Sequence, residues 1–366
     1  MINLIGYFPY SFGIAEGARG TLRALNHLNI KANALPVEIP GLPITNNDFI
    51  SQYSNQSIYD TSIIYMNPSQ MLPIVDYIPK NKYNIGVWNW ELEQFPSMWD
   101  AAFNYVDEIW TPSTFTQKSI QKSTNKKVSK VPIPVSVSYN KNITKESIGI
   151  PDHVFVFYTM FDFDSAIERK NPEGIINAFK SAFDKSNTSV CLILKITYNN
   201  ETAAPQTRES YNNLIQMLEG YPNIFILNEN LVKEDLNALV NLSDCFISLH
   251  RSEGYGLGPA EAMAMGKPVI STNWSATTEF MSSDAAMLVD YKLTKVFGYF
   301  YDDVLRQAHQ MWADPDVEHA AFFMKKIYSD EQFRNNISKN AKKVFETDYS
   351  LDSISKIIQE KLGAIK

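Results

Sequence analysis

The order of apolar and polar positions along the chain predicts an α/β protein. Short apolar runs bounded by turn residues alternate with longer stretches of helical period, which is typical of parallel sheets covered by helices. In the first half we expect buried strands at residues 3–6, 63–66, 84–87 and 108–111, with helices at 15–28 and 114–121. In the second half we expect strands at 154–159, 189–196, 224–227, 245–249 and 269–271. From residue 303 onward the pattern is almost entirely helical.

A proline-containing stretch divides these two series of elements. Residues 131–135 read V-P-I-P-V, and each proline lacks a backbone donor and restricts the residue before it, so this stretch predicts the start of an interdomain linker. The chain of 366 residues also exceeds the size at which a single core stops growing. We therefore expect an N-terminal domain over 1–137, a second domain over 138–330, and C-terminal helices over 331–366.

Composition excludes some classes of protein but does not identify the function. Hydrophobic residues make up 45% and charged residues 20%, as in ordinary globular proteins, and the net charge of -7 argues against a general nucleic-acid binder. Cys191 and Cys245 lie inside apolar runs and are interpreted as small core residues. The N-terminus lacks a signal-peptide pattern, and no apolar run reaches the length of a spanning helix. We expect a cytoplasmic protein; peripheral contact with the inner face of a membrane and a homo-oligomer stay open.

The segment 252–261 combines several devices suited to an anionic ligand. A strand runs into a loop that carries glycine at alternate positions, namely Gly254, Gly256 and Gly258. Pro259 suits the first turn of a helix, and Gly266 with Pro268 ends it. A glycine-rich loop that leads into a helix N-terminus presents free N–H groups and the positive end of the helix dipole to a phosphate. The alternative is a tight strand-to-helix turn without a ligand.

Two carboxylates favour the ligand interpretation. Glu253 precedes the glycine loop, and Glu261 falls in the first turn of the helix. Acidic groups beside a phosphate site repel the phosphate unless they bind hydroxyl groups. A ribose and a hexose supply such hydroxyls, so the pattern predicts a sugar nucleotide.

The run S-E-G-Y-G-L-G-P-A-E-A-M-A-M-G-K-P-V-I from residue 252 resembles the retaining glycosyltransferases of the GT-B fold, in particular glycosyltransferase family 4. The resemblance implies two Rossmann-like α/β domains that face a central cleft, with the last helices crossing back to the first domain. It also implies that Glu261 binds the ribose, that Glu253 contacts the transferred sugar, and that the amides of Leu257 and Gly258 hold the diphosphate. The complete set of expected donor-binding residues is Glu261, Gly13, Gly254, Tyr255, Gly256, Leu257, Gly258 and Lys195.

A second stretch, 168–174, resembles the place where the family keeps a basic residue against the donor diphosphate. Arg169 and Lys170 are the candidates; alternatively they are solvated charges at a helix start. The family arginine that usually comes a few residues earlier is missing, and Lys195 is the candidate to replace its charge. In the first half, Gly13 resembles the family's glycine loop near the leaving phosphate, with Glu16 and Arg19 as weaker candidates.

The clearest departure from the family is a missing histidine in the first domain. Residues 86–96 read G-V-W-N-W-E-L-E-Q-F-P where the histidine would stand. We expect Trp88, Asn89, Trp90 and Glu91 to form that wall of the cleft, with Glu91 as a catalytic candidate beside Glu253, Arg169 and Lys170. The alternative for the tryptophans is a packed aromatic cluster.

The expected reaction is transfer of a glycosyl group, of hexosyltransferase type, from a nucleoside diphosphate sugar to a glycan, glycolipid or protein acceptor in bacterial-type surface polysaccharide or glycoconjugate synthesis. No metal and no further cofactor are expected, although Asp162 and Asp164 form a D-x-D motif of the kind that binds metal in another glycosyltransferase fold. The rivals are a catalytically silent binding partner of the same fold and a sugar-nucleotide epimerase. Donor sugar, base, acceptor, linkage and oligomeric state are not identified by the sequence.

Overall fold

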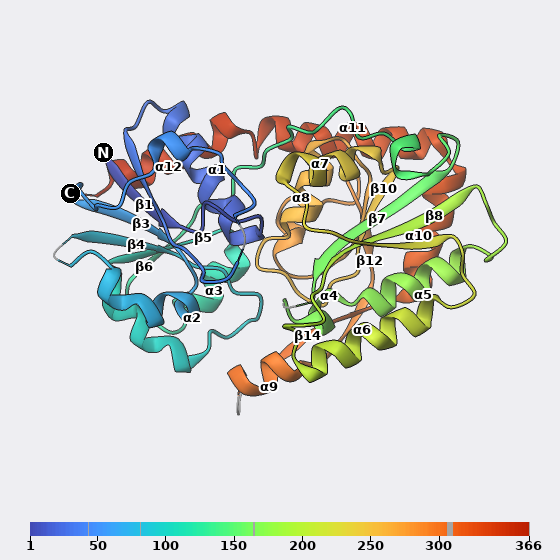
Figure 1. The fold of residues 1–366 in the computed structure, drawn as a ribbon, viewed down its shortest axis with the longest axis horizontal. Helices are drawn as coiled ribbons and strands as arrows, with labels where there is room; N and C mark the ends of the chain where they lie inside the picture. Colours follow the sequence, from blue (N-terminus) through green and yellow to red (C-terminus); the bar gives the residue numbers. More distant parts are fainter. Residues whose placement is uncertain (43, 81, 164, 306–309, 366) are drawn as a thin grey trace. The chain divides into compact units, whose positions relative to one another are not determined.

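The computed structural model describes residues 1–42, 44–80, 82–163, 165–305 and 310–365 (Figure 1). The chain divides into two compact units: unit 1 comprises Met1–Ser136 and Glu346–Lys366, and unit 2 comprises Val137–Phe345. The proline-containing stretch 131–135 therefore ends one residue before the first segment of unit 1 does. Residues 331–345, which the sequence assigned to the C-terminal helices, belong to unit 2.

Unit 1 is built on a six-stranded parallel sheet, in the order β2 (Ala32–Pro36), β1 (Ile2–Gly6), β3 (Thr61–Tyr65), β4 (Tyr83–Val87), β5 (Glu108–Thr111) and β6 (Lys127–Lys130). The four predicted strands are confirmed. The two edge strands, β2 and β6, were not predicted. They read A-N-A-L-P and K-V-S-K, and an edge strand needs no continuous apolar run because one of its sides lies outside the sheet.

The helices of unit 1 are α1 (Gly13–His27), α2 (Pro68–Met71), α3 (Thr114–Gln121) and α12 (Leu351–Gly363), with 3₁₀ turns at Ile50–Gln52, Leu72–Tyr77 and Ser97–Tyr105. Ser113 caps α3 as predicted, since its side chain accepts a hydrogen bond from the amide of Thr116. Helix α12 packs on α1, and its Ile354 and Ile358 are buried in the same core as Leu22 and Leu25. The last helix of the chain is thus part of the first unit's core.

Unit 2 carries a second six-stranded parallel sheet, in the order β12 (Met287–Val289), β11 (Val269–Thr272), β10 (Cys245–Ser248), β7 (Phe155–Asp162), β8 (Val190–Thr197) and β9 (Ile224–Asn228). The five predicted strands are confirmed. Cys191 and Cys245 are free and buried, as interpreted. The chain runs outward from β7 to β9 and then returns to β10, so the order reverses between β7 and β10. Ligands bind open α/β sheets at such a reversal, outside the carboxyl ends of the strands.

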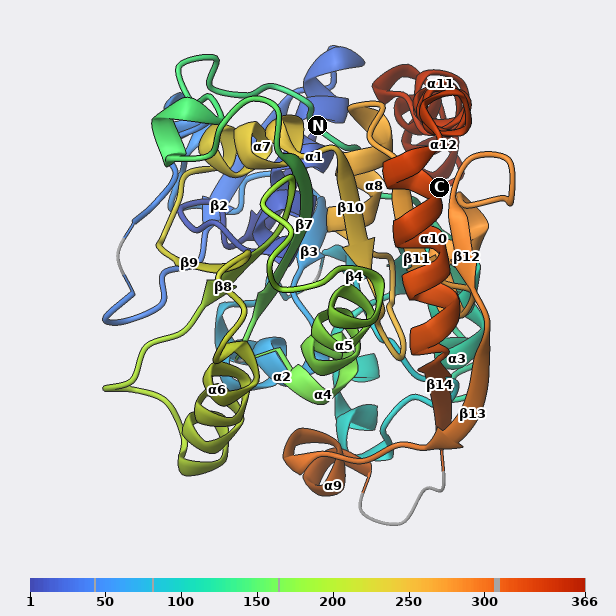
Figure 2. The same cartoon turned by 90° about the vertical axis from the view of Figure 1, so that its right-hand side faces the viewer.

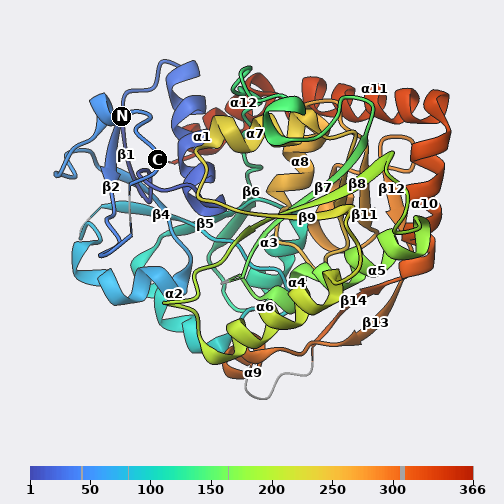
Figure 3. The same cartoon turned by 45° about the vertical axis from the view of Figure 1, so that its right-hand side comes forward.

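Helices cover both faces of this sheet (Figure 2, Figure 3). One face is covered by α5 (Pro172–Ala182), α6 (Pro205–Leu218) and α10 (Val317–Ser329), where α10 packs on α5. The other is covered by α7 (Lys233–Leu242) and α8 (Leu257–Ala264), which contact each other. A 3₁₀ turn at Glu146–Ile148 precedes β7, and the short helix α4 (Ile167–Lys170) follows it. Helix α11 (Glu331–Thr347) leads toward the C-terminus.

The prediction of an almost entirely helical chain from residue 303 is wrong at one place. Residues Met311–Pro315 form β14, which pairs antiparallel with β13 (Tyr291–Lys295); α9 (Tyr299–Leu305) lies between these two strands in sequence. Trp312 and Ala313 are buried there while Asp314 is exposed. No helix among the described residues is both long enough and apolar enough to span a membrane.

Candidate donor-binding site

The loop that leaves β10 is anchored by a buried histidine. His250 is fully buried; its Nδ1 lies 3.0 Å from the Ser248 hydroxyl and its Nε2 3.2 Å from the Thr277 hydroxyl. Burial lowers the pKa of His250 to about 4, so the ring is neutral at pH 7. A neutral imidazole can donate from one nitrogen and accept at the other, which suits a link between two hydroxyl groups. The histidine thus fixes the start of the loop to the 3₁₀ turn at Ser275–Glu279.

Glycine is required where the loop becomes helix α8. Gly256 is the N-cap residue, with φ of +89°, and a Cβ added to it would lie 2.5 Å from the Thr277 Cγ2. Gly258, in the first turn, leaves room for Met160, whose Cε would lie 2.9 Å from an added Cβ. The first N–H groups of any α-helix have no partner within the helix, so this turn presents donors at the carboxyl edge of the sheet.

Glu253 is the centre of a buried charge cluster. Its carboxylate oxygens pair with Arg169 Nη1 at 2.8 Å and with Lys170 Nζ at 2.6 Å. Burial by itself would raise the pKa of Glu253, but the charges of Arg169 and Lys170 outweigh burial and hold the pKa at about 2. The carboxylate is therefore ionised throughout the physiological range. Its backbone N–H donates to the Ser275 hydroxyl at 2.8 Å.

The alternative that Arg169 and Lys170 are solvated charges is wrong for Arg169, which is buried, while Lys170 is partly exposed and paired with Glu253. The Arg169 side chain is only 7% exposed and Nη1 also donates to the Ser252 carbonyl at 3.0 Å. Asn171, which caps α5 in a left-handed conformation, donates from Nδ2 to the Leu249 carbonyl at 3.0 Å. These bonds fasten α4 to the loop after β10, so segments about 80 residues apart in sequence form one site.

Glu261 is buried on α8 beside a lysine that the sequence analysis missed. The glutamate is 1% exposed, and its Oε1 lies 2.5 Å from Nζ of Lys233, the first residue of α7. The charge of Glu261 also acts on Tyr158 of β7. Burial raises the pKa of the Tyr158 hydroxyl, and the Glu261 carboxylate raises it further. A lysine at a helix N-terminus opposes the helix dipole, and this unfavourable position is the signal that could have identified Lys233 as half of a pair.

Two other expected donor contacts, Tyr255 and Lys195, lie in surroundings different from those of Glu253 and Glu261. The Tyr255 ring is buried against Phe280, with ring centroids 5.6 Å apart, so the ring belongs to the packing around the loop. Lys195 on β8 is buried and donates to the Thr197 hydroxyl at 3.1 Å. Burial lowers the pKa of Lys195, and the charges of Asp162 and Glu229 act in the opposite direction. Lys195 therefore belongs to the end of β8 and not to the cluster around Glu253.

In unit 1, the prediction that Trp88 and Trp90 face a sugar is wrong. Trp88 is completely buried and stacks on Phe95 at 5.9 Å between centroids, and Trp90 is 2% exposed, with its ring edge-on to Trp99 at 5.1 Å. The aromatic cluster is the correct interpretation because indole rings buried against each other have no face to offer a sugar. Asn89 and Glu91 are half-buried, and their role stays a prediction.

The other unit 1 candidates lie on or beside α1. Gly13 is exposed at the first position of the helix, with open space around it. Arg19 is buried: it donates to the carbonyls of Phe8 and Tyr10 at 2.7 Å each and pairs with the buried Glu16. Glu16 and Arg19 therefore fix the loop after β1 to the helix, which explains both without a ligand.

For a metal, Asp164 of the D-x-D motif lies outside the described residues. Within the described part of the chain, no three or more His, Cys, Asp or Glu side chains are grouped so that they could hold a metal ion. The absence of a metal requirement stays a prediction.

Comparisons with known proteins give a family match for the domain that carries this site. Residues 149–292, which hold β7 through β12, match the family model described as "Glycosyl transferases group 1". No curated protein sequence matches the chain.

Solved structures share the fold over the full length. Anabaena HepE in complex with UDP and glucose superposes with a TM-score of 0.71 at 12% identity, covering 100% of this chain and 99% of its own. Sucrose-phosphate synthase from Thermosynechococcus elongatus gives 0.72 at 14% identity, with 100% and 99% covered. WaaG, a glycosyltransferase involved in lipopolysaccharide biosynthesis, gives 0.63 at 12% identity, with 100% of both chains covered. The chain therefore has the GT-B fold, and residues 149–292 of its second unit are similar to the group 1 glycosyl transferases.

Proposed function

We propose that this protein transfers a sugar from a nucleoside diphosphate sugar to an acceptor hydroxyl with retention of the anomeric configuration. One observation carries the proposal. Arg169 and Lys170 are held by Glu253 beside the N-terminus of α8, and Glu261 is buried on the same helix just past its first turn. Two cations and a helix N-terminus suit a diphosphate, and the two carboxylates suit the hydroxyl groups on either side of it.

The diphosphate would take over the cations that now neutralise Glu253. Without a donor, Glu253 is the anion that compensates the charge of Arg169 and Lys170. When the phosphates bind, they supply that negative charge, and the Glu253 carboxylate becomes available to accept hydrogen bonds from the transferred sugar. The same two cations then stabilise the charge that develops on the leaving diphosphate, which is the larger effect on the rate.

At the other end of the donor, Glu261 would accept hydrogen bonds from the ribose. Lys233 pairs with this carboxylate and orients it at a depth where an unpaired charge would be costly. Leaving-group assistance completes the chemistry: the departing diphosphate receives the proton of the acceptor hydroxyl on the face from which it leaves. The reaction then needs no covalent intermediate.

The similar structures support a nucleotide-sugar donor and a role in surface carbohydrate. HepE was solved with UDP and glucose, and WaaG is described as acting in lipopolysaccharide biosynthesis. We accordingly propose a UDP-hexose as donor and a glycan or glycolipid of a bacterial-type surface polysaccharide as acceptor. No metal is proposed, so activity should persist in EDTA; its loss, with recovery on adding Mg²⁺ or Mn²⁺, would contradict this part.

A panel of UDP-, GDP-, ADP- and dTDP-sugars tests the proposal. The true donor should raise the melting temperature, because a ligand that binds only the folded state stabilises it by mass action. That donor should then be hydrolysed or transferred by the wild type and about 10²–10³-fold more slowly by Lys170→Ala, as when one charge-stabilising donor is removed from an active site. Lys185→Ala, at an exposed lysine of the same unit, is the control and should keep full activity.

Two outcomes favour the rivals. Stabilisation by a sugar nucleotide without transfer or hydrolysis would indicate a silent binding protein. Conversion of the donor to its epimer without an acceptor would indicate an epimerase. No stabilisation by any sugar nucleotide would contradict the proposal as a whole.

A further inference from the structure

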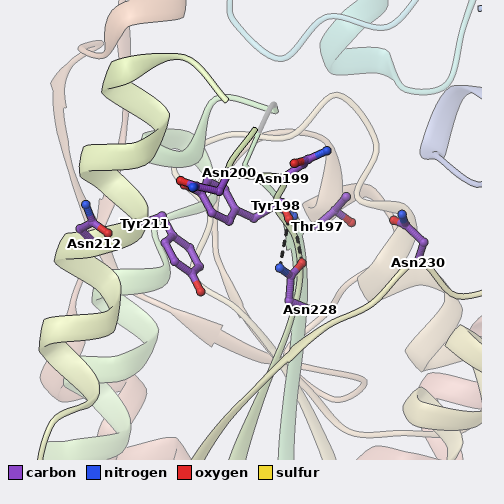
Figure 4. Close-up of a pocket in the computed structure, with 8 residues that line it drawn as sticks. All are labelled: Thr197, Tyr198, Asn199, Asn200, Tyr211, Asn212, Asn228 and Asn230. Carbon is purple, nitrogen blue, oxygen red and sulfur yellow. Dashed lines mark hydrogen bonds between the residues drawn. The ribbon is translucent and has the colours of Figure 1, made fainter. Parts of the chain in front are cut away.

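Unit 2 has a pocket that none of the expected donor contacts lines. It has a volume of about 580 Å³ and lies at the carboxyl ends of β8 and β9, against α6 (Figure 4). Helix α6 covers the face of the sheet opposite to α7 and α8 (Figure 3). The lining residues are Thr197, Tyr198, Asn199, Asn200, Tyr211, Asn212, Asn228 and Asn230.

The pocket is shaped in advance by its own side chains. The rings of Tyr198 and Tyr211 stack with centroids 3.9 Å apart and planes 7° from parallel. The amide of Asn228 closes a double hydrogen bond with the backbone of Tyr198, accepting from its N–H at 3.1 Å and donating to its carbonyl at 3.0 Å. The Tyr198 hydroxyl donates to Asn200 Oδ1 at 2.9 Å. A ligand would therefore meet groups that are already ordered, which lowers the entropic cost of binding.

The lining has the chemistry of a site for uncharged hydroxyl groups. Five of the eight residues are asparagines, and none of the eight is charged. A carboxamide can donate and accept, so it matches hydroxyl groups, which do the same. Both N–H groups of the Asn200 amide stay available, and within the described chain the side chains of Asn212 and Asn230 hydrogen-bond no other residue.

Charges near the pocket do not turn it into an anion site. Lys195 lies behind Thr197, buried, with its ammonium group donating to the Thr197 hydroxyl. Burial lowers the pKa of Lys195, and the charges of Asp162 and Glu229 act on the same ammonium group in the opposite direction. A phosphate or a carboxylate would find no cation among the lining residues, whereas a neutral saccharide needs none.

We propose that this pocket is a carbohydrate-binding subsite, separate from the donor site, that holds a neutral saccharide. The pocket is at the same carboxyl edge of the sheet as the loop 252–261. β8 lies two strands from β10, which is about 10 Å at the usual strand spacing. Given the proposed glycosyltransferase function, the saccharide is a segment of the acceptor or of the elongated product, held beside the place of transfer.

The test uses an array of neutral and acidic oligosaccharides probed with the full-length protein in the presence of saturating UDP. The array should identify neutral glycans that bind, and titration of the best one by calorimetry should show binding that UDP does not displace. Asn212→Arg, which places a long cation over the pocket, should weaken that binding at least 10-fold. Asn213→Arg, at the neighbouring exposed position of α6 that does not line the pocket, should leave it unchanged.

Each other result overturns the inference. Binding to no glycan, binding to acidic glycans alone, displacement by UDP, or equal loss in Asn212→Arg and Asn213→Arg would each contradict a neutral-saccharide subsite. Thermal unfolding of both variants, which change exposed residues, shows whether they are folded. The proposed function fails independently: a protein that binds the neutral glycan but is stabilised by no sugar nucleotide would keep this subsite and lose the transferase.

Discussion

The loop 252–261 of unit 2 and the segment 88–91 of unit 1 both carry residues suited to a sugar, but the fold uses them differently. In unit 2 the carboxylates are buried together with cations, so Glu253 pairs with Arg169 and Lys170, and Glu261 with Lys233. In unit 1 the tryptophans are buried against other aromatic rings. A buried charge needs partners and is seldom kept for packing alone, whereas a buried indole is an ordinary core residue. Charge beside the glycine loop is therefore a better guide to the site than the tryptophans are, whereas the buried pair of Arg19 and Glu16 only holds a loop in place.

Removing Trp88 gives the largest expected effect on stability. Trp88→Ala should lower the free energy of unfolding by about 3–5 kcal/mol, as when other large aromatic residues are removed from a core. Donor affinity should stay within about 2-fold, because the side chain packs on Phe95 and Phe103 and not on a ligand. Urea unfolding and donor titration measure the two effects. A donor affinity that falls 10-fold in a folded variant would restore the sugar-facing interpretation.

Lowering the pH should destabilise unit 2, because two of its buried titratable groups have shifted pKa values. The folded state holds the pKa of His250 at about 4, below its ordinary value of 6.5, so the unfolded chain takes up this proton first and stability falls as pH drops from 6.5 to 4. Glu253, with a pKa of about 2 against 4.5, adds a loss between pH 4.5 and 2.

The His250 contribution is on the order of 3 kcal/mol across its window. Urea unfolding at pH 7, 5.5 and 4.5 measures it, and His250→Asn is the control in which this part of the pH dependence should vanish. An equal pH dependence in wild type and variant would show that His250 is not the source.

Two glycines make a matched pair from the two units. Gly256→Ala should cost about 2 kcal/mol and abolish donor binding, because the new Cβ meets Thr277 and the backbone has positive φ. Gly13→Ala should be neutral or stabilise by up to about 1 kcal/mol, because its position is helical and open. Thermal unfolding ranks them. If Gly13→Ala weakened donor binding and Gly256→Ala did not, the donor site would include Gly13. If Gly13→Ala were the less stable of the two variants, the geometry around Gly256 would be contradicted.

Most of the fold was readable from the sequence because parallel strands buried on both faces are continuous apolar runs. The elements that escaped were the edge strands β2, β6 and β12 and the hairpin of β13 and β14. Strand β12 has only three residues, and the others have half-polar patterns that do not differ from those of loops. For the site, the glycine loop and both glutamates were found from local spacing. Lys233, His250 and Thr277 were not found, since their roles depend on contacts between segments distant in sequence.

We propose that Arg169 and Lys170, released by Glu253, hold a diphosphate while Glu261 holds the ribose. The direct measurement is calorimetric titration of the preferred nucleoside diphosphate and of its parent nucleoside into wild type, Lys170→Ala and Glu261→Gln. Lys170→Ala should weaken binding of the diphosphate at least 10-fold and leave binding of the nucleoside unchanged, whereas Glu261→Gln should weaken binding of both. If Lys170→Ala bound the diphosphate as tightly as the wild type does, the account would be contradicted.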